Sequence, residues 1–218
     1  MDCSGQLQTF DGIEGRQTRR CIGLLGGTFN PVHNGHLYMA RKALDEFGLE
    51  KVVFIPSGNP PHKANETVAH AEHRYAMLEL ALEGAPGFFI SRVELDRPGP
   101  TYTADTLETL HRASPDSRFY FIIGADTLCD LHTWRNFERV AQLAAFICFM
   151  RPGVREETVR AYMRALADTY GLKTLLSAYA GLDVSSRQVR EALSQRRPVD
   201  GLVGEKVARY IRDNGVYG

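Results

Sequence analysis

Two histidines stand three residues apart at the end of a glycine-rich turn, a spacing that suits phosphate chemistry. The turn covers residues 26–36, GGTFNPVHNGH, with His33 and His36 near its end. It follows the apolar run 21–25 and precedes residues 37–44, whose apolar positions recur at helical spacing. The pattern predicts a strand, a tight turn and a helix that begins beside the histidines.

A helix start of this kind binds anions. Backbone N–H groups in the first turn lack partners within the helix, and the helix dipole is positive there. Gly26 and Gly27 would let the backbone approach a phosphate closely. The two imidazoles add hydrogen-bond donors at the same place. We therefore predict a nucleotide-binding site at this turn.

Other interpretations of this turn stay open. A glycine pair before a helix is often only a tight turn, and a histidine is often a surface or core residue. A histidine pair at this spacing is also compatible with zinc, which needs three or four protein ligands. No cysteine or third histidine stands nearby, although ligands can come from distant parts of the chain. Such a zinc site would favour a metal-dependent hydrolase.

Composition narrows the class of protein. Lys and Arg together number 26, as do Asp and Glu, so no overall positive charge points to nucleic acid. The longest apolar stretch, 143–150, is too short to span a bilayer. The four cysteines form no CxxC pair, and reduced thiols are expected. We expect a cytoplasmic protein without a membrane or nucleic-acid partner; a homo-oligomer is compatible with the sequence.

Apolar runs alternate with helical patterns along the chain, which predicts an α/β protein with a doubly wound, mostly parallel sheet and helices on both faces. A polar segment, 1–20, without an apolar core is predicted to be a disordered leader, followed by one domain, 21–218. Neither GxGxxG nor the Walker lysine follows the first strand, which argues against a P-loop NTPase. The predicted strands are 21–25, 52–55, 88–95, 119–123, 144–150 and 174–178. The predicted helices are 35–48, 70–83, 103–113, 134–143, 154–169, 185–194 and 203–213.

Short loops after the predicted strands should converge on one crevice, because ligands of open α/β sheets bind outside the carboxyl ends of the strands. One loop carries His62 and Lys63, and the lysine suits a phosphate contact or is simply solvated. Another contains Gly124 and Asp126. This carboxylate is expected to accept hydrogen bonds from ribose hydroxyls, or to cap the next helix.

Two further helix starts carry polar groups. In 99–106, GPTYTADT, Thr103 is predicted to be an N-cap whose helix start would also suit a carboxylate. In 184–190, VSSRQVR, Ser185 or Ser186 is predicted to cap a helix with Arg190 one turn later. This gives a second phosphate cradle. Trp134 is the only tryptophan; it is either a core residue or a flat surface for an aromatic ring.

Taken together, these motifs resemble the nicotinate-nucleotide adenylyltransferase family of the HxGH nucleotidyltransferase superfamily, with its Rossmann-like fold. The resemblance covers residue 21 to the C-terminus and rests on GGTFNPVHNGH, PPHK, GPTYTADTL with GADTL, and SSRQVR. Two positions depart from the usual family pattern: Asn30 replaces a frequent Asp, and Arg187 replaces a hydroxyl residue.

The resemblance implies transfer of the adenylyl group of ATP to nicotinate mononucleotide, giving nicotinate adenine dinucleotide and pyrophosphate in NAD biosynthesis. An enzyme for nicotinamide mononucleotide, or for both mononucleotides, is the alternative. Phosphopantetheine or FMN as acceptor, and a non-catalytic nucleotide sensor, are weaker alternatives. Mg²⁺ is the implied cofactor, bound mainly through ATP phosphates rather than by protein ligands.

The resemblance also implies a role for each motif residue. The catalytic residues would be His33, His36 and Arg190. The ATP-binding residues would be Gly26, Gly27, Thr28, Phe29, His33, His36, Gly124, Asp126, Ser185, Ser186 and Arg190. The residues binding nicotinate mononucleotide would be His62, Lys63, Tyr102, Thr103 and Trp134.

Overall fold

A computed structural model describes residues 20–59 and 68–217. The predicted leader, except Arg20, lies outside the described residues, as do His62 and Lys63. The first strand begins at Arg20, one residue before the predicted domain boundary.

The described strands form one six-stranded sheet in the order β3-β2-β1-β4-β5-β6. Every neighbouring pair is parallel, which confirms the predicted sheet. Parallel strands need crossover connections, and helices supply them here. The strand bounds are β1 Arg20–Gly27, β2 Lys51–Pro56, β3 Phe88–Ile90, β4 Ser117–Gly124, β5 Ala144–Met150 and β6 Thr174–Ala180.

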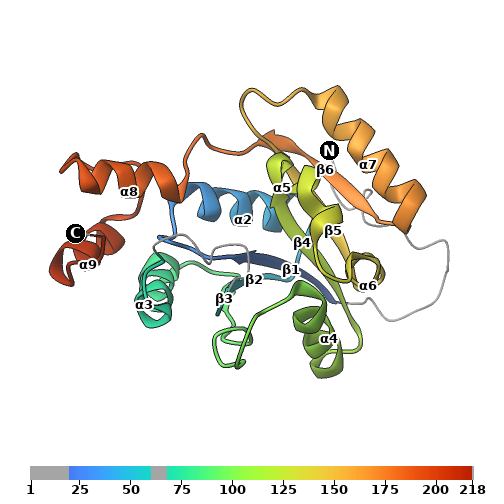
Figure 1. The fold of residues 1–218 in the computed structure, drawn as a ribbon, viewed down its shortest axis with the longest axis horizontal. Coiled ribbons are helices and arrows are strands. Elements are labelled where there is room, and N and C mark those ends of the chain that lie inside the picture. Colours follow the sequence, from blue (N-terminus) through green and yellow to red (C-terminus); the bar gives the residue numbers. More distant parts are fainter. Residues whose placement is uncertain (1–19, 60–67, 218) are drawn as a thin grey trace.

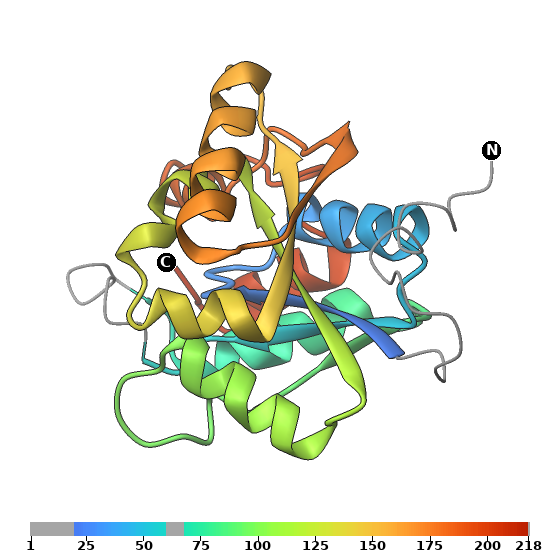
Figure 2. The ribbon, with the colours of Figure 1, turned by 90° about the vertical axis from the view of Figure 1, so that its right-hand side faces the viewer.

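The helices cover both faces of the sheet, as predicted. One core cluster packs α2, α3, α8 and α9 against one face, and a second packs α4, α5, α6 and α7 against the other. Figure 1 shows α8 and α9 at one end beside α2 and α3, with α7 at the other end; Figure 2 shows the sheet between α2 and α6. The helix bounds are α2 Asn34–Glu46, α3 Ala71–Leu82, α4 Thr103–Ala113, α5 Ala125–Asp130, α6 Phe137–Leu143, α7 Glu156–Tyr170, α8 Ser186–Ser194 and α9 Glu205–Asp213. A 3₁₀ turn, η2, covers Leu131–Thr133.

The two clusters follow from the alternation of side chains along each strand. In β4, Tyr120 and Ile122 belong to the first cluster, whereas Phe119, Phe121 and Ile123 belong to the second. These strands are apolar on both sides, as expected for a parallel sheet covered on both faces. Both faces of the sheet therefore exclude water, and polar groups gather at the ends of the strands.

The direction of winding reverses between β1 and β4. From β1 the chain proceeds outward to β2 and β3, and it then returns to place β4 on the other side of β1. The connections after β1 and β4 consequently go to opposite faces and leave a crevice at their carboxyl ends. This is the place where the loops predicted to bind substrate begin.

Two predicted elements, β3 and α6, are shorter than expected by three residues or more. β3 ends at Ile90, because the chain leaves the sheet after Ser91 donates to the carbonyl of Phe54. α6 begins at Phe137 rather than at residue 134, because Asn136 has a left-handed backbone with φ of 55°. The short helix α5 was missing from the prediction. Among the described residues no helix is long and apolar enough to cross a membrane.

Candidate active site

The turn after β1 presents the histidine pair at the first turn of α2. His33 is the N-cap residue, with extended backbone, and only 4% of it is exposed. The two imidazole rings stack with centroids 3.6 Å apart. Phe29, itself buried, packs its ring edge against His36 at 4.9 Å. The structure thus brings together the histidines and the turn that the sequence placed beside them.

A hydrogen bond selects the tautomer of His36. Its Nδ1 accepts the backbone N–H of His33 at 3.2 Å. A neutral imidazole has one N–H donor, so its proton must lie on Nε2. His36 therefore offers a donor, fixed in direction by the start of its own helix.

Both histidines are neutral donors near pH 7. Burial, aided by the positive charge of Arg151, lowers the pKa of His33 to about 4. Burial, His33 and Arg151 together lower the pKa of His36 well below its usual value. The two rings thus offer neutral N–H donors, while Arg151 supplies positive charge beside them.

Arg151 is the residue that the sequence analysis missed. It follows β5, and its Nε lies 3.5 Å from Oδ1 of Asp126 in the loop after β4. Gly124 makes room for this pair, because a Cβ there would overlap the Asp126 carboxylate. Its position after a central parallel strand, like that of Asp126, was the signal in the sequence.

A small pocket opens beside the histidines, with about 230 Å³ of empty space including space open to solvent. Its lining is largely apolar, and it reaches from α2 to the segment between β6 and α8. Sequence motifs gave no indication of it, because its walls come from three segments that lie far apart in the chain. The lining residues are His33, Gly35, Met39, Phe149, Met150, Arg151, Gly181, Leu182 and Val184.

Helix α8 closes the turn from the other side. Ser185 is its N-cap, as predicted, and its hydroxyl accepts the Gln188 N–H at 3.2 Å. Ser186 donates its hydroxyl hydrogen to the carbonyl of Pro31 at 2.8 Å. Arg190 donates to the carbonyl of Asn30, also at 2.8 Å. The second predicted cradle is thereby joined directly to the first.

Arg187, the departure from the family pattern, is turned outward. Its side chain is 82% exposed and pairs with Glu191 at 2.7 Å, one helical turn onward. Its charge is therefore partly balanced within α8 rather than directed at the turn after β1.

The cap predicted for α4 was wrong by one residue. Tyr102, with extended backbone, is the N-cap, and Thr103 is the first helical residue. The helical hydrogen bond from the Thr106 N–H goes to the Tyr102 carbonyl, which fixes the start there. The first-turn N–H groups still begin at Thr103, so the anion-binding character of this helix start is retained.

Trp134 lies on the same side of the sheet as α4. Its ring packs against Phe121 and Phe146, with centroids 5.8 and 6.3 Å away. It is only half-buried. Next to it, the Arg135 guanidinium stacks on the Tyr102 ring at 4.5 Å. The core and the ligand interpretations of Trp134 are thus both compatible with its position, and Tyr102 is brought close to it.

A zinc centre at the histidines would need more ligands. Within 20–59 and 68–217, no group of three or more His, Cys, Asp and Glu side chains is placed to hold a metal ion. His33 and His36 instead stack on each other, and Phe29 packs edge-on against His36.

Comparison with known proteins places the chain in a family. The Cytidylyltransferase-like family model matches residues 24–192. A Corynebacterium glutamicum protein named "Probable nicotinate-nucleotide adenylyltransferase" is 40% identical, over 91% of this chain and 89% of the relative. The Bacillus subtilis nicotinate-nucleotide adenylyltransferase is 39% identical, over 90% of this chain and 97% of the relative. This chain belongs to the nicotinate-nucleotide adenylyltransferase family.

Solved structures agree on the fold of this family member. The Plasmodium falciparum nicotinic acid mononucleotide adenylyltransferase, complexed with NaAD, superimposes with a TM-score of 0.75. That match covers 91% of this chain and 97% of the neighbour at 20% identity. The same neighbour complexed with APC gives a TM-score of 0.74.

The other departure from the family pattern, Asn30, has a physical explanation. Its side-chain Oδ1 accepts two hydrogen bonds, from the Ala69 N–H at 3.0 Å and from the Tyr217 hydroxyl at 2.7 Å. An aspartate carries an oxygen that accepts in the same way. The substitution thus preserves the contacts that hold the turn.

Proposed function

We propose that this protein transfers the adenylyl group of ATP to nicotinate mononucleotide, producing nicotinate adenine dinucleotide and pyrophosphate. The observation that carries this is the stacked pair of His33 and His36 at the start of α2, beside the start of α8. Related proteins from Corynebacterium glutamicum and Bacillus subtilis are named for this activity. The reaction serves NAD biosynthesis.

The ATP phosphates would lie between the two helix starts. His36 would donate from Nε2 to the α-phosphate, with His33 supporting its orientation through the stacked rings. The first turn of α8, with its backbone N–H groups, suits the β- and γ-phosphates. Ser185, Ser186 and Arg190 supply the side chains there. The backbone of Gly27, Thr28 and Phe29 would complete the cradle.

Gly26 also has a packing role beneath the turn. A Cβ at this position would lie 2.8 Å from the ring of Phe121 in β4. Glycine there allows β1 and β4 to pack closely below the crevice. Gly26 thus supports the ATP site from beneath.

The adenosine part of ATP would occupy the pocket beside His33. Met39, Phe149 and Leu182 give it apolar walls that suit a purine ring. Asp126, exposed just after β4, would accept hydrogen bonds from ribose hydroxyls. Arg151, paired with Asp126, would keep that carboxylate in position.

The mononucleotide would enter from the side of α4. The first-turn N–H groups at Thr103 suit the carboxylate of the nicotinate ring, and Tyr102 and Trp134 would frame the ring itself. His62 and Lys63, outside the described residues, are the proposed contacts for its phosphate. The two substrates would therefore meet in the crevice between β1 and β4.

The chemistry requires placement more than proton transfer. A phosphate monoester has a second pKa of about 6, so near neutral pH the acceptor is already a dianionic nucleophile. Two polyanions must then approach in line, which requires charge neutralisation and orientation. Arg190, Lys63 and the helix starts supply these, and His36 donates to the charge that develops on the α-phosphate.

Mg²⁺ is proposed to bind mainly to phosphate oxygens of ATP. It would neutralise charge on the polyphosphate. Histidines that are neutral near pH 7 add donors but no positive charge at this turn, which leaves phosphate charge for Mg²⁺ to neutralise. The protein is proposed to act in the cytoplasm on ATP and nicotinate mononucleotide, without nucleic acid.

Use of nicotinamide mononucleotide is the alternative, since an amide replaces only the ring carboxylate. Pyrophosphate release with ATP and Mg²⁺ should be compared for both mononucleotides at matched concentrations, with phosphopantetheine as a negative control. A large preference in kcat/KM for nicotinate mononucleotide would support carboxylate recognition at α4. Equal rates would retain adenylyl transfer and refute that recognition. Absence of release with any acceptor would overturn the enzyme assignment and favour a nucleotide sensor.

A further inference from the structure

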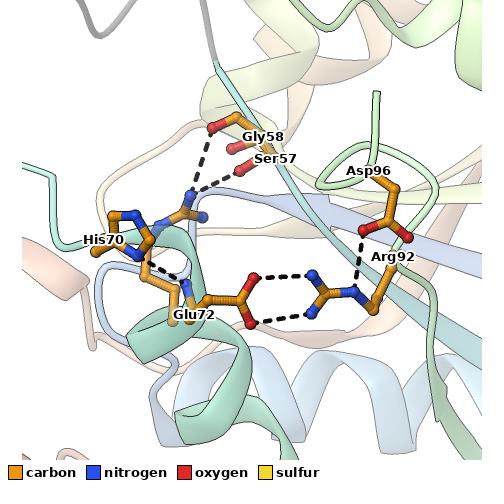
Figure 3. A network of polar contacts seen from close by, with 7 residues as sticks. Ser57, Gly58, His70, Glu72, Arg92 and Asp96 are labelled. Atoms are coloured by element: carbon orange, nitrogen blue, oxygen red, sulfur yellow. Dashed lines mark hydrogen bonds and ion pairs between the residues drawn. The ribbon is translucent and has the colours of Figure 1, made fainter. Parts of the chain in front are cut away.

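A fully buried arginine connects the turn after β1 to the loop after β2. Arg74 lies in the first turn of α3, with 1% of it exposed. It donates to the carbonyl of Thr28 at 2.7 Å, in the turn after β1. It also donates to the carbonyl of Ser57 at 2.8 Å, in the loop after β2. Figure 3 shows Ser57 and Gly58 with their carbonyl oxygens directed at this contact.

A second set of contacts holds the segment before α3 against the turn after β1. The Ala69 carbonyl, just before α3, accepts from Nε of Arg74 at 3.0 Å. The Ala69 N–H donates to Oδ1 of Asn30, which also accepts from the Tyr217 hydroxyl. Both the N–H and the carbonyl of Ala69 thus form hydrogen bonds with the side chains that hold the turn. We call Arg74, Asn30 and Tyr217 the loop clamp.

The charge of Arg74 is balanced in an unusual way. Its partners are backbone carbonyls, and within the described residues no carboxylate lies within ion-pair distance of its guanidinium. A buried ion without an opposite charge is costly, and removal of the guanidinium would leave several buried carbonyls without donors. The forked guanidinium of Arg74 is thus matched to carbonyls of the turn after β1, the loop after β2 and the segment before α3.

The clamp is specific to the substrate loops. On the outer side of α3, Glu72 forms an exposed, two-bonded pair with Arg92, the shorter contact being 2.8 Å (Figure 3). That pair connects α3 to the segment after β3. The loop clamp instead connects the turn that carries the histidines to the loop that leads to His62 and Lys63.

We propose that the loop clamp is a positioning device that sets the turn after β1 and the loop after β2 in register. The two phosphates then meet in line. The inference depends on the proposed function, in which these loops bind the phosphates of the two different substrates. Each loop would still bind its own substrate without the clamp, but their relative placement would be lost. A misplacement of about 1 Å in such a step costs roughly 100-fold in rate.

Two clamp variants and two matched controls test this. Arg74→Lys keeps the charge but loses the forked contacts, and Tyr217→Phe removes only the hydroxyl. Arg41→Lys alters a guanidinium that donates to the Pro86 carbonyl, just before β3 begins. Tyr210→Phe removes a hydroxyl bonded to His73 at 3.0 Å. For each, kcat, both KM values and the melting temperature are measured, with turnover assayed well below every melting temperature.

The clamp predicts a loss in kcat with little change in binding. Arg74→Lys should lower kcat by about 10- to 100-fold and Tyr217→Phe by several-fold, with both KM values within about threefold of the parent protein. The controls should keep kcat within about twofold. If Arg74→Lys does not fold, the kcat and KM values of Tyr217→Phe alone test the proposed clamp. Lower melting temperatures with unchanged kcat in both clamp variants would reduce the clamp to a structural role. Absence of turnover in the unaltered protein would overturn the proposed function and, with it, the clamp.

Discussion

At the level of single residues, the histidine pair shows how burial defines a catalytic donor. An exposed histidine near pH 7 is partly protonated, and its tautomer is free to change. Here His36 is neutral, and the backbone N–H of His33 fixes its proton on Nε2. Positive charge near the turn belongs to other residues, Arg190 and Arg151. Donor direction and positive charge are thus set by different residues.

Removal of the His36 imidazole is expected to reduce turnover strongly. His36→Ala should lower kcat by about 100- to 1,000-fold, because a donor directed at developing charge is lost. Steady-state pyrophosphate release measures this. His111→Ala is the control, since His111 bonds the Leu143 carbonyl away from the turn. Turnover of His36→Ala close to that of the parent protein would exclude His36 from the mechanism.

His33 should make the protein less stable in mild acid. Its pKa is about 4 when folded and near 6.5 when unfolded, so between these values the unfolded chain binds more protons. The free energy of unfolding should therefore fall as the pH drops through this range. Between pH 7 and pH 5 the contribution of His33 is about 2 kcal/mol. Urea unfolding at several pH values measures it. His33→Asn should flatten the dependence, and an equal slope in that variant would contradict the prediction.

At the level of elements, two helix starts on opposite faces of the sheet have distinct supports. The start of α8 is held by its capping box and by the contact of Ser186 with Pro31. The start of α4 is held by Thr106, which is buried and donates to Glu94 at 2.8 Å. Arg97 donates to the same hydroxyl at 3.2 Å. Burial raises the pKa of the Glu94 carboxyl, and the hydrogen bond from Thr106 acts in the opposite direction by stabilising the charged carboxylate.

Loss of the Thr106 hydroxyl should weaken α4 and its proposed ligand. Thr106→Val leaves the buried Glu94 with one donor fewer, at a cost of about 1–3 kcal/mol in stability. The KM for nicotinate mononucleotide should rise several-fold, while the KM for ATP should not change. Thr109→Val is the matched control, because its exposed hydroxyl donates within α4 to the Asp105 carbonyl. An equal rise in both KM values would contradict the assignment of α4 to the acceptor.

At the level of the whole molecule, the strand order places the two proposed substrate sites on opposite faces of the sheet. The order β3-β2-β1-β4-β5-β6 sends the chain after β1 and after β4 to opposite faces of the sheet. The histidine pair and α8 belong to one face, and α4 with Trp134 belongs to the other. Each substrate is therefore expected to bind without the other, and to stabilise the fold independently.

The separation predicts a crossed pattern of ligand effects. At about 100 times its Kd, a ligand adds about 2.7 kcal/mol of stability, or roughly 5–10 °C in melting temperature. His36→Ala should reduce the shift caused by ATP with Mg²⁺ and preserve the shift caused by nicotinate mononucleotide. Thr106→Val should reduce the shift caused by nicotinate mononucleotide and preserve the shift caused by ATP with Mg²⁺. Differential scanning fluorimetry with each ligand alone measures both. Loss of both shifts in either folded variant would show one shared site.

The sequence by itself determined the fold class, the six strands and the main motifs. Alternating apolar runs and helical spacing are local properties, and parallel strands buried on both faces leave clear apolar segments. For the same reason the cap at Ser185 was predictable, because capping involves residues three positions apart. The N-cap of α4 was missed by one residue and the start of α6 by three, since single backbone angles at Tyr102 and Asn136 decide them.

Only the tertiary structure decided how distant side chains act on the site. Arg74, which belongs to none of the sequence motifs, is buried and bonds to carbonyls of two loops and of the segment before its own helix. Arg151 and Asp126 meet from separate strand ends, and Arg190 reaches a carbonyl 160 positions away in the chain. No local pattern encodes these contacts, because packing of the sheet and helices determines which chain segments become neighbours.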